Sequence, residues 1–347
     1  MASPSSEYGY ISAKLKARSS RFLADEGIER VVRSKSLQEA FLNLRGSFLE
    51  GLEAQYAASG DLKSVEAFLA SKERNAYAEI VGSLPGPAAA FIDAYAEKHS
   101  IDLLKDALRL WFDAHVRSRP IEDRAIYLGN GKLRAGSGRA LMDLTAVSHA
   151  ASFTEVVQAL SSTVYGPVVS TALPEAVSKG SLFELECALD RLYFDGLFSA
   201  FQALSPRDRA SVERLVGLDV DIQNIANLVR LGTVSGLGAD AAQKYLMDFS
   251  AAAPAAELAR SFSSDNVSGM ASTLLGSEAR VPNLGALERL LRRMRLSEAR
   301  KRLAGDPFSI GIVMAYFVLF GEEVRRVRMI LNAKYFGLSE DRLRSAV

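Results

Sequence analysis

The chain has 347 residues, 48% of them hydrophobic and 24% charged, which is typical of a globular protein with two or three subdomains. The formal net charge is only +1. The single cysteine, Cys187, excludes an internal disulfide, and we expect a small buried side chain rather than a catalytic thiol. Residues 1–20 hold no apolar segment followed by a cleavage site, so we expect a cytoplasmic protein.

Helical periodicities dominate the chain, and little of it is typical of strands. Gly and Pro residues separate the helical segments at 85–87, 166–167, 205–206 and 282. We therefore predict an all-α fold with short connections. The exception is a Gly-rich, basic loop at 128–139.

One apolar pattern occurs three times, at offsets 0, 3 and 7. The copies are Ile101, Leu104 and Leu108; Ile222, Ile225 and Val229; and Val324, Val327 and Leu331. A basic residue follows at offset 8 in the first two copies, Arg109 and Arg230, whereas the third has Asn332. Any amphipathic helix has this spacing, but each copy closes one third of the chain. We predict three helical subdomains, at 1–120, 121–240 and 241–347.

The loop at 128–139 lacks the pattern of a phosphate-binding loop. A P-loop needs Gly, four residues and then Gly-Lys-Ser/Thr, but Leu133 replaces the hydroxyl residue and Ile126 the first Gly. We predict a flexible connector between subdomains and no nucleotide site.

No catalytic or metal-binding pattern is recognisable either. His99, His115 and His149 lie 16 and 34 residues apart, without an i,i+4 pair or a nearby Cys, so zinc spacing is absent. The sequence also has no Gly-x-Ser-x-Gly motif. We expect no enzyme activity, no cofactor, no metal and no small-molecule substrate.

Two polar residues of the second copy, Asp221 and Asn224, are candidates for binding a partner. A helix cap or a hydrogen bond between helices is the alternative role for them.

The C-terminal part of the chain is basic. Residues 280–347 hold 14 Lys and Arg against 7 Asp and Glu, which gives this part a charge of +7 and the rest −6. Within it, 289–303 is a predicted basic amphipathic helix that carries Arg292 and Arg293. Such a face binds an acidic protein, a lipid surface or nucleic acid, or is only solvated. Interleaved aromatic residues, which stack on single-stranded nucleic acid, are missing.

Residues 306–337 pass from an apolar helix into a charged one. Asp306 is a candidate N-cap and Pro307 a first-turn residue of a helix that stays apolar to Phe320. A bilayer span needs about 20 apolar residues, and two glutamates end this run at about two thirds of that length. We predict a buried core helix rather than a membrane segment.

The following segment is amphipathic and ends at Gly337, a candidate C-cap. Glu322 can reach Arg325 and Arg326 at three and four residues. These two arginines and Arg328 either bind a partner across a cavity wall or pair with nearby acids of the chain.

Six segments, in order, resemble motifs of the C subunit of the A/V-type rotary ATPases, a family whose eukaryotic counterpart is the V-ATPase d subunit. They are Tyr8 to Arg18, Gly131-Lys132-Leu133, Thr163-Val164-Tyr165, Glu186 to Tyr193, Asp221 to Arg230, and the stretch from Pro307 through Glu322-Glu323-Val324-Arg325. Together they span nearly the whole chain.

The resemblance implies three similar helical subdomains in a pseudo-threefold, funnel-like arrangement. It also implies a non-catalytic rotor subunit of the central stalk in a proton- or sodium-translocating ATPase or ATP synthase. Such a protein sits on the membrane proteolipid ring, at the cytoplasmic face, and accepts the D and F subunits of the shaft in its cavity. The alternative is a helical adaptor that binds an acidic partner or nucleic acid through its basic helix.

Overall fold

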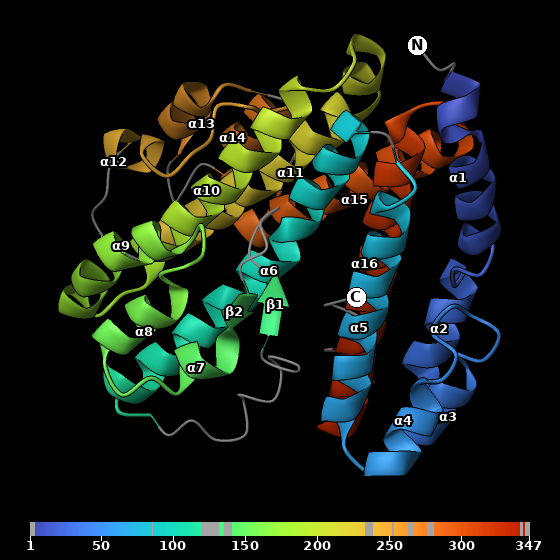
Figure 1. Ribbon diagram of the computed structural model, residues 1–347, viewed down its shortest axis with the longest axis horizontal. Coiled ribbons are helices and arrows are strands. Elements are labelled where there is room, and N and C mark those ends of the chain that lie inside the picture. Colours follow the sequence, from blue (N-terminus) through green and yellow to red (C-terminus); the bar gives the residue numbers. More distant parts are fainter. Residues whose placement is uncertain are drawn as a thin grey trace.

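Helices make up almost all of the described chain (Figure 1). The computed structural model describes residues 4–84, 86–119, 132–134, 141–232, 239–251, 253–262, 267–275, 281–340 and 343. Within these ranges sixteen helices occur, which confirms the predicted all-helical class. A short antiparallel ladder joins β1 (Lys132–Arg134) to β2 (Leu141–Asp143). The rest of the predicted connector at 128–139 lies outside the described residues.

Ten of the helices in the described ranges are shorter than 20 residues. They are α1 (Pro4–Ser19), α2 (Asp25–Arg33), α3 (Leu37–Leu42), α4 (Leu52–Ser59), α7 (Leu144–Ser148), α8 (Phe153–Leu160), α9 (Gly166–Lys179), α12 (Ala239–Gln243), α13 (Ala255–Ser261) and α14 (Val267–Leu275).

Six long helices form the frame of the fold. They are α5 (Leu62–Val81), α6 (Gly86–His115), α10 (Phe183–Gln202), α11 (Pro206–Gly232), α15 (Leu284–Ala304) and α16 (Ile310–Tyr335). The helix α16 runs beside α5, with α1 to α4 next to this pair (Figure 1). The helix α6 packs on α10, and α15 packs on both α11 and α16.

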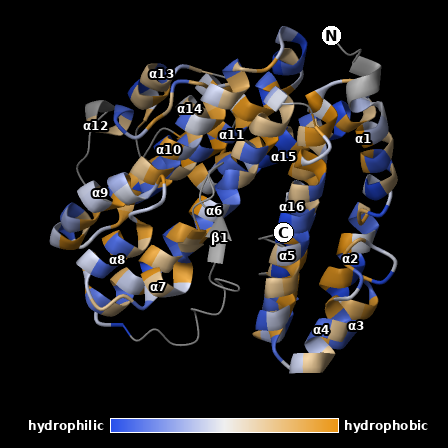
Figure 2. Cartoon of the chain, viewed as in Figure 1, coloured by the Kyte–Doolittle hydropathy of each residue, from blue (hydrophilic) through white to orange (hydrophobic). Residues whose placement is uncertain are grey.

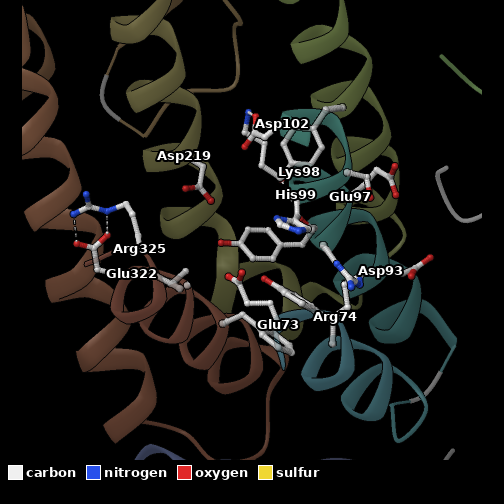
Figure 3. Close-up of a pocket in the computed structure, with 18 of the residues that line it drawn as sticks. Glu73, Arg74, Asp93, Glu97, Lys98, His99, Asp102, Asp219, Glu322 and Arg325 are labelled. Carbon is white, nitrogen blue, oxygen red and sulfur yellow. Dashed lines mark hydrogen bonds and ion pairs between the residues drawn. The ribbon is translucent and has the colours of Figure 1, made fainter. Parts of the chain in front are cut away.

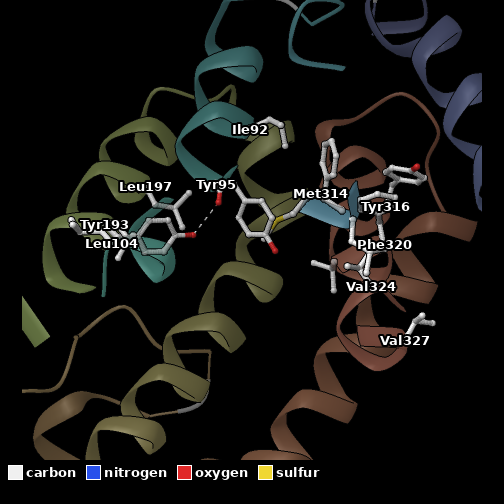
Figure 4. Close-up of a cluster of buried hydrophobic side chains, with 14 of the residues drawn as sticks. Ile92, Tyr95, Leu104, Tyr193, Leu197, Met314, Tyr316, Phe320, Val324 and Val327 are labelled. Carbon is white, nitrogen blue, oxygen red and sulfur yellow. Dashed lines mark hydrogen bonds between the residues drawn. The ribbon is translucent and has the colours of Figure 1, made fainter. Parts of the chain in front are cut away.

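Buried apolar side chains form two clusters. The larger one extends from α1 through α10 to α16, and the smaller one lies between α11, α12 to α14 and α15. Figure 4 shows part of the larger cluster, with Tyr95, Tyr193 and Leu197 on one side and Met314, Tyr316 and Phe320 on the other. Figure 2 shows hydrophobic and hydrophilic residues interspersed along the helices.

The apolar stretch in the C-terminal part is a core element, as predicted. Every residue from Ile310 to Val318 is buried. In the part of the chain that the structure describes, no helix is long and apolar enough to cross a membrane.

The expected division of 306–337 into two helices is wrong. The helix α16 continues through Gly321 to Tyr335 because its buried stripe does not stop at the glutamates. Val324, Val327 and Leu331 extend the same apolar face.

The predicted N-cap at Asp306 is also wrong. The helix begins at Ile310, whose amide donates to Asp208 Oδ1 of α11 at 3.0 Å, while Asp306 Oδ1 accepts only from the Phe308 amide. At the other end, Gly337 has the predicted left-handed conformation, with φ of +66°. The Leu338 amide donates to Ala333 O, so the helix closes in a Schellman motif.

Candidate functional site

A cavity of about 1070 Å³ lies between the six long helices (Figure 3). Each long helix contributes lining residues, among them Glu73 of α5, Lys98 of α6, Tyr193 of α10, Asp219 of α11 and Arg325 of α16. Charged side chains dominate the labelled wall in Figure 3. The cavity can therefore recognise a polar partner.

The three repeat copies lie on α6, α11 and α16, and their equivalent positions face this one cavity. The lining residues at offset −3 are Lys98, Asp219 and Gly321, and those at offset +1 are Asp102, Gln223 and Arg325. The repeated apolar positions are buried or packed against the core. The repeat thus has a spatial counterpart, namely three helices that present the same register to one space.

Asp219 and Arg295 form a mostly buried ion pair on the cavity wall, with side chains that are 14% and 18% exposed. The Asp219 Oδ1 to Arg295 Nε distance is 2.5 Å, and Arg295 Nη2 also donates to the Tyr95 hydroxyl at 2.7 Å. Burial raises the pKa of Asp219, although Arg295 opposes this effect. The pair links α6, α11 and α15.

Asp190, which is fully buried on α10, joins three helices beside the cavity. Lys98 Nζ lies 3.1 Å from its Oδ1, Lys105 Nζ donates to the same oxygen, and Gln223 donates to Oδ2 at 3.0 Å. Burial, together with the neighbouring Lys98, lowers the pKa of Lys105. One carboxylate therefore holds α6 and α11 on α10.

The basic residues of the first two repeat copies converge on Glu186. Arg109 Nε donates to Glu186 Oε1 at 2.6 Å, and Arg230 Nη2 pairs with Oε2. Glu186 is only 3% exposed, so two arginines neutralise one buried carboxylate. The third copy has a different contact, because Asn332 donates to Glu66 of α5 at 2.6 Å.

The predicted partner-binding arginines occupy three different environments. Arg325 and Arg292 line the cavity, each with a side chain that is 40% exposed and paired within its own helix, to Glu322 and Glu288 respectively. Arg326 pairs with Glu322 and is only 20% exposed.

The other two predicted arginines, Arg328 and Arg293, do not line the cavity. Arg328 lies 3.3 Å from Glu73 of α5, so it connects the first and last thirds of the chain. Arg293 is exposed and pairs with no carboxylate among the described residues.

Asp221 and Asn224 lie inside the fold rather than on the cavity wall. Asn224 Nδ2 donates to Met247 O at 3.0 Å, and the Met247 amide donates back to Asn224 Oδ1 at 2.9 Å. Asp221 accepts from the Ser250 hydroxyl, and burial raises its pKa to about 6. Both side chains hold the segment 247–250 on α11.

A family model described as "ATP synthase (C/AC39) subunit" matches residues 11–346. The chain belongs to this family. The finding confirms the resemblance that the ordered motifs indicated.

Curated relatives of this C/AC39 member are named as the C subunit of an A-type ATP synthase. The protein of Methanothermobacter thermautotrophicus is 25% identical over 342 residues, which cover 94% of this chain and 84% of the relative. That of Halorubrum lacusprofundi is 26% identical over 361 residues, which cover 98% and 97%. That of Methanosarcina mazei is 23% identical over 351 residues, which cover 97% and 91%.

Burial favours the neutral forms of Cys187 and His99 in this C/AC39 protein. Burial raises the pKa of Cys187 to about 12, so its thiol stays protonated at neutral pH. Burial and nearby arginines lower the pKa of His99 to about 4, which leaves a neutral imidazole beside the cavity. Among the residues with described positions, no group of His, Cys, Asp and Glu could hold a metal ion.

Sequence reasoning missed most of the cavity wall. Lys98, Asp219 and Arg295 carry no recognised motif, and their importance comes from their position. Lys98 and Asp219 each lie three residues before a repeat copy, on the helix face next to its apolar stripe. The repeat could therefore have indicated these two positions.

Proposed function

We propose that this chain is the C subunit of an A-type ATP synthase and acts as a non-catalytic rotor subunit of the central stalk. In this role it couples the shaft to the ring of membrane proteolipid subunits. The main support is the charged cavity, which is lined by residues at the same repeat offsets on α6, α11 and α16. The family match from residue 11 to 346 is the second support.

The proposed architecture has three subdomains, at 1–120, 121–240 and 241–347, around a funnel-like cavity with pseudo-threefold symmetry. Equivalent offsets on α6, α11 and α16 support this arrangement, since each third of the chain supplies one wall helix. The end of the shaft, formed by the D and F subunits, would occupy the cavity.

Coupling without chemistry requires a stiff body. The buried carboxylates Asp190 and Glu186 and the mostly buried Asp219 each join helices from different parts of the chain. Breaking such a buried pair leaves an uncompensated charge, which costs about 3–5 kcal/mol, so the helices resist separation. These contacts suit a component that transmits torque between two partners.

Arg292 and Arg325 are the proposed shaft-facing residues, because both line the cavity and remain partly exposed. Their guanidinium groups can form further hydrogen bonds with carboxylates of a partner.

In the proposed complex, contact with the ring holds the protein at the cytoplasmic face of the membrane.

The proposal is tested by co-purification of the chain with the other subunits from membranes in mild detergent. The unmodified chain should co-purify with both shaft and ring and should hydrolyse no ATP alone. The double variant R292E/R325E should lose the shaft, whereas R33E/R45E, which changes two exposed arginines of α2 and the segment after α3, should keep it. A chain that appears with neither partner would overturn the proposal.

A further inference from the structure

The outer face of α15 carries three exposed arginines in one line. Arg289, Arg293 and Arg300, hereafter the arginine row, lie at i, i+4 and i+11. At about 100° per residue they share a sector of about 40° and extend over about 16 Å. Arg295, which faces the cavity wall, lies on the opposite side of the helix.

The arginine row has fewer carboxylate partners than the other arginines of α15 have. Arg292 and Arg302 pair with glutamates four residues earlier, at 2.7 and 2.8 Å. Arg289 and Arg293 pair with no carboxylate in the described ranges, and Arg300 forms one long ion pair, at 3.9 Å, with the exposed Asp25 of α2. The i,i+4 pair Arg289 and Arg293 is of like charge, which destabilises a helix.

We propose that the arginine row is a docking site for an acidic helix of a neighbouring protein. A line of guanidinium groups about 16 Å long matches about three turns of a helix with carboxylates on one face. Arginine binds carboxylates through paired, charge-assisted hydrogen bonds, which also fix the register of the partner. The arginine row is not among the residues that line the cavity, so the proposed site is distinct from the cavity.

The composition of the outer face favours a protein over a lipid or nucleic acid. A helix that lies in a membrane surface exposes large apolar side chains beside its basic ones. None of the exposed large hydrophobic residues in the described part belongs to α15. The helix also has no aromatic residue that could stack on a base.

The experiment measures binding of the full chain to poly-L-glutamate at pH 7 and low ionic strength, by fluorescence anisotropy. The variant R289E/R293E/R300E should bind at least about tenfold more weakly, because it replaces attraction by repulsion at three positions. The matched control K16E/K35E/K244E makes the same change in net charge at exposed lysines that lie elsewhere. It should bind within about twofold of the unmodified chain.

A neutral variant, R289Q/R293Q/R300Q, provides the second measurement. It keeps the length of the side chains and should also weaken binding while its thermal unfolding stays that of the unmodified chain. Equal losses in the row and control variants would overturn the proposal, since they would indicate a general effect of net charge. Stronger, row-dependent binding to phosphatidylserine vesicles or to duplex DNA would overturn it in favour of those partners.

Discussion

Tyr77 of α5 stacks on Phe317 of α16, with ring centroids 3.8 Å apart and ring planes inclined by 10°. Farther along the same two helices, Glu73 pairs with Arg328 and Glu66 accepts from Asn332. These contacts join the first third of the chain to the last. One wall of the cavity is therefore formed where α5 packs on α16.

Replacement of Phe317 by alanine tests the contribution of the ring stack between α5 and α16. The side chain is 1% exposed, so Phe317→Ala should lower the free energy of unfolding by about 3–5 kcal/mol. The control Phe153→Ala, at a ring that is 48% exposed, should change it by less than about 0.5 kcal/mol. Urea denaturation measures both, and equal effects would contradict the role of the stack.

Glu186 should be essential to the packing of α10. Glu186→Gln leaves Arg109 and Arg230 without their shared carboxylate and should cost about 3–5 kcal/mol of unfolding free energy. In the exposed pair Arg45 and Glu53, the change Glu53→Gln should cost less than about 1 kcal/mol. Thermal denaturation of both variants compares them, and a small effect at position 186 would show that the pair is dispensable.

Two adjacent glutamates of α16 should give opposite pH effects. Burial raises the pKa of Glu323 to about 7, although its carboxylate accepts from the Leu23 amide at 2.9 Å. Since the unfolded value is 4.5, the folded chain binds the extra proton between pH 4.5 and 7, and stability falls as pH rises through this range. Glu323→Gln should therefore stabilise the chain by about 1–3 kcal/mol at pH 8, and this gain should vanish below about pH 4.5.

Glu322→Gln is the matched control for that measurement. Burial alone would raise the pKa of Glu322, but the hydrogen bonds from Arg325 and Arg326 lower it below 4.5. Its stabilising contribution is present above pH 4.5 and is lost as pH falls through the folded pKa. The variant should be less stable than the unmodified chain at pH 8, and the same sign for both variants would contradict the assignment.

Asn224 should protect the backbone of the segment that follows α12. Asn224→Ala removes both hydrogen bonds to Met247 and should cost about 2–4 kcal/mol, because two buried backbone groups lose their partners. Hydrogen exchange at the Met247 amide should accelerate in this variant. It should stay unchanged in Gln202→Ala, at an exposed side chain, and unchanged exchange in both would exclude the proposed contact.

The sequence predicted those parts of the fold that depend on local spacing. The apolar repeats of α6, α11 and α16 are visible because a helix buries one face at intervals of about 3.6 residues. The Gly337 cap is visible because the left-handed conformation favours glycine.

Contacts between distant segments could not be predicted in this way. The cap of α16 comes from Asp208, 102 residues before Ile310, and this contact makes the local candidate Asp306 unnecessary. Likewise Arg109, Arg230 and Glu186 each lie in a recognisable pattern of the sequence, but their contact depends on how α6 and α11 pack on α10. The cavity wall is a product of that packing.

Crosslinking in the assembled complex tests directly whether the shaft occupies the cavity. In a Cys187→Ser background, single cysteines replace Arg292 or Arg325 in the cavity, and Arg207, which is 49% exposed outside it, serves as the control. Both cavity positions should form crosslinks to a shaft subunit, and position 207 should form none. Crosslinks to the shaft from position 207 but from neither cavity position would contradict this placement of the shaft.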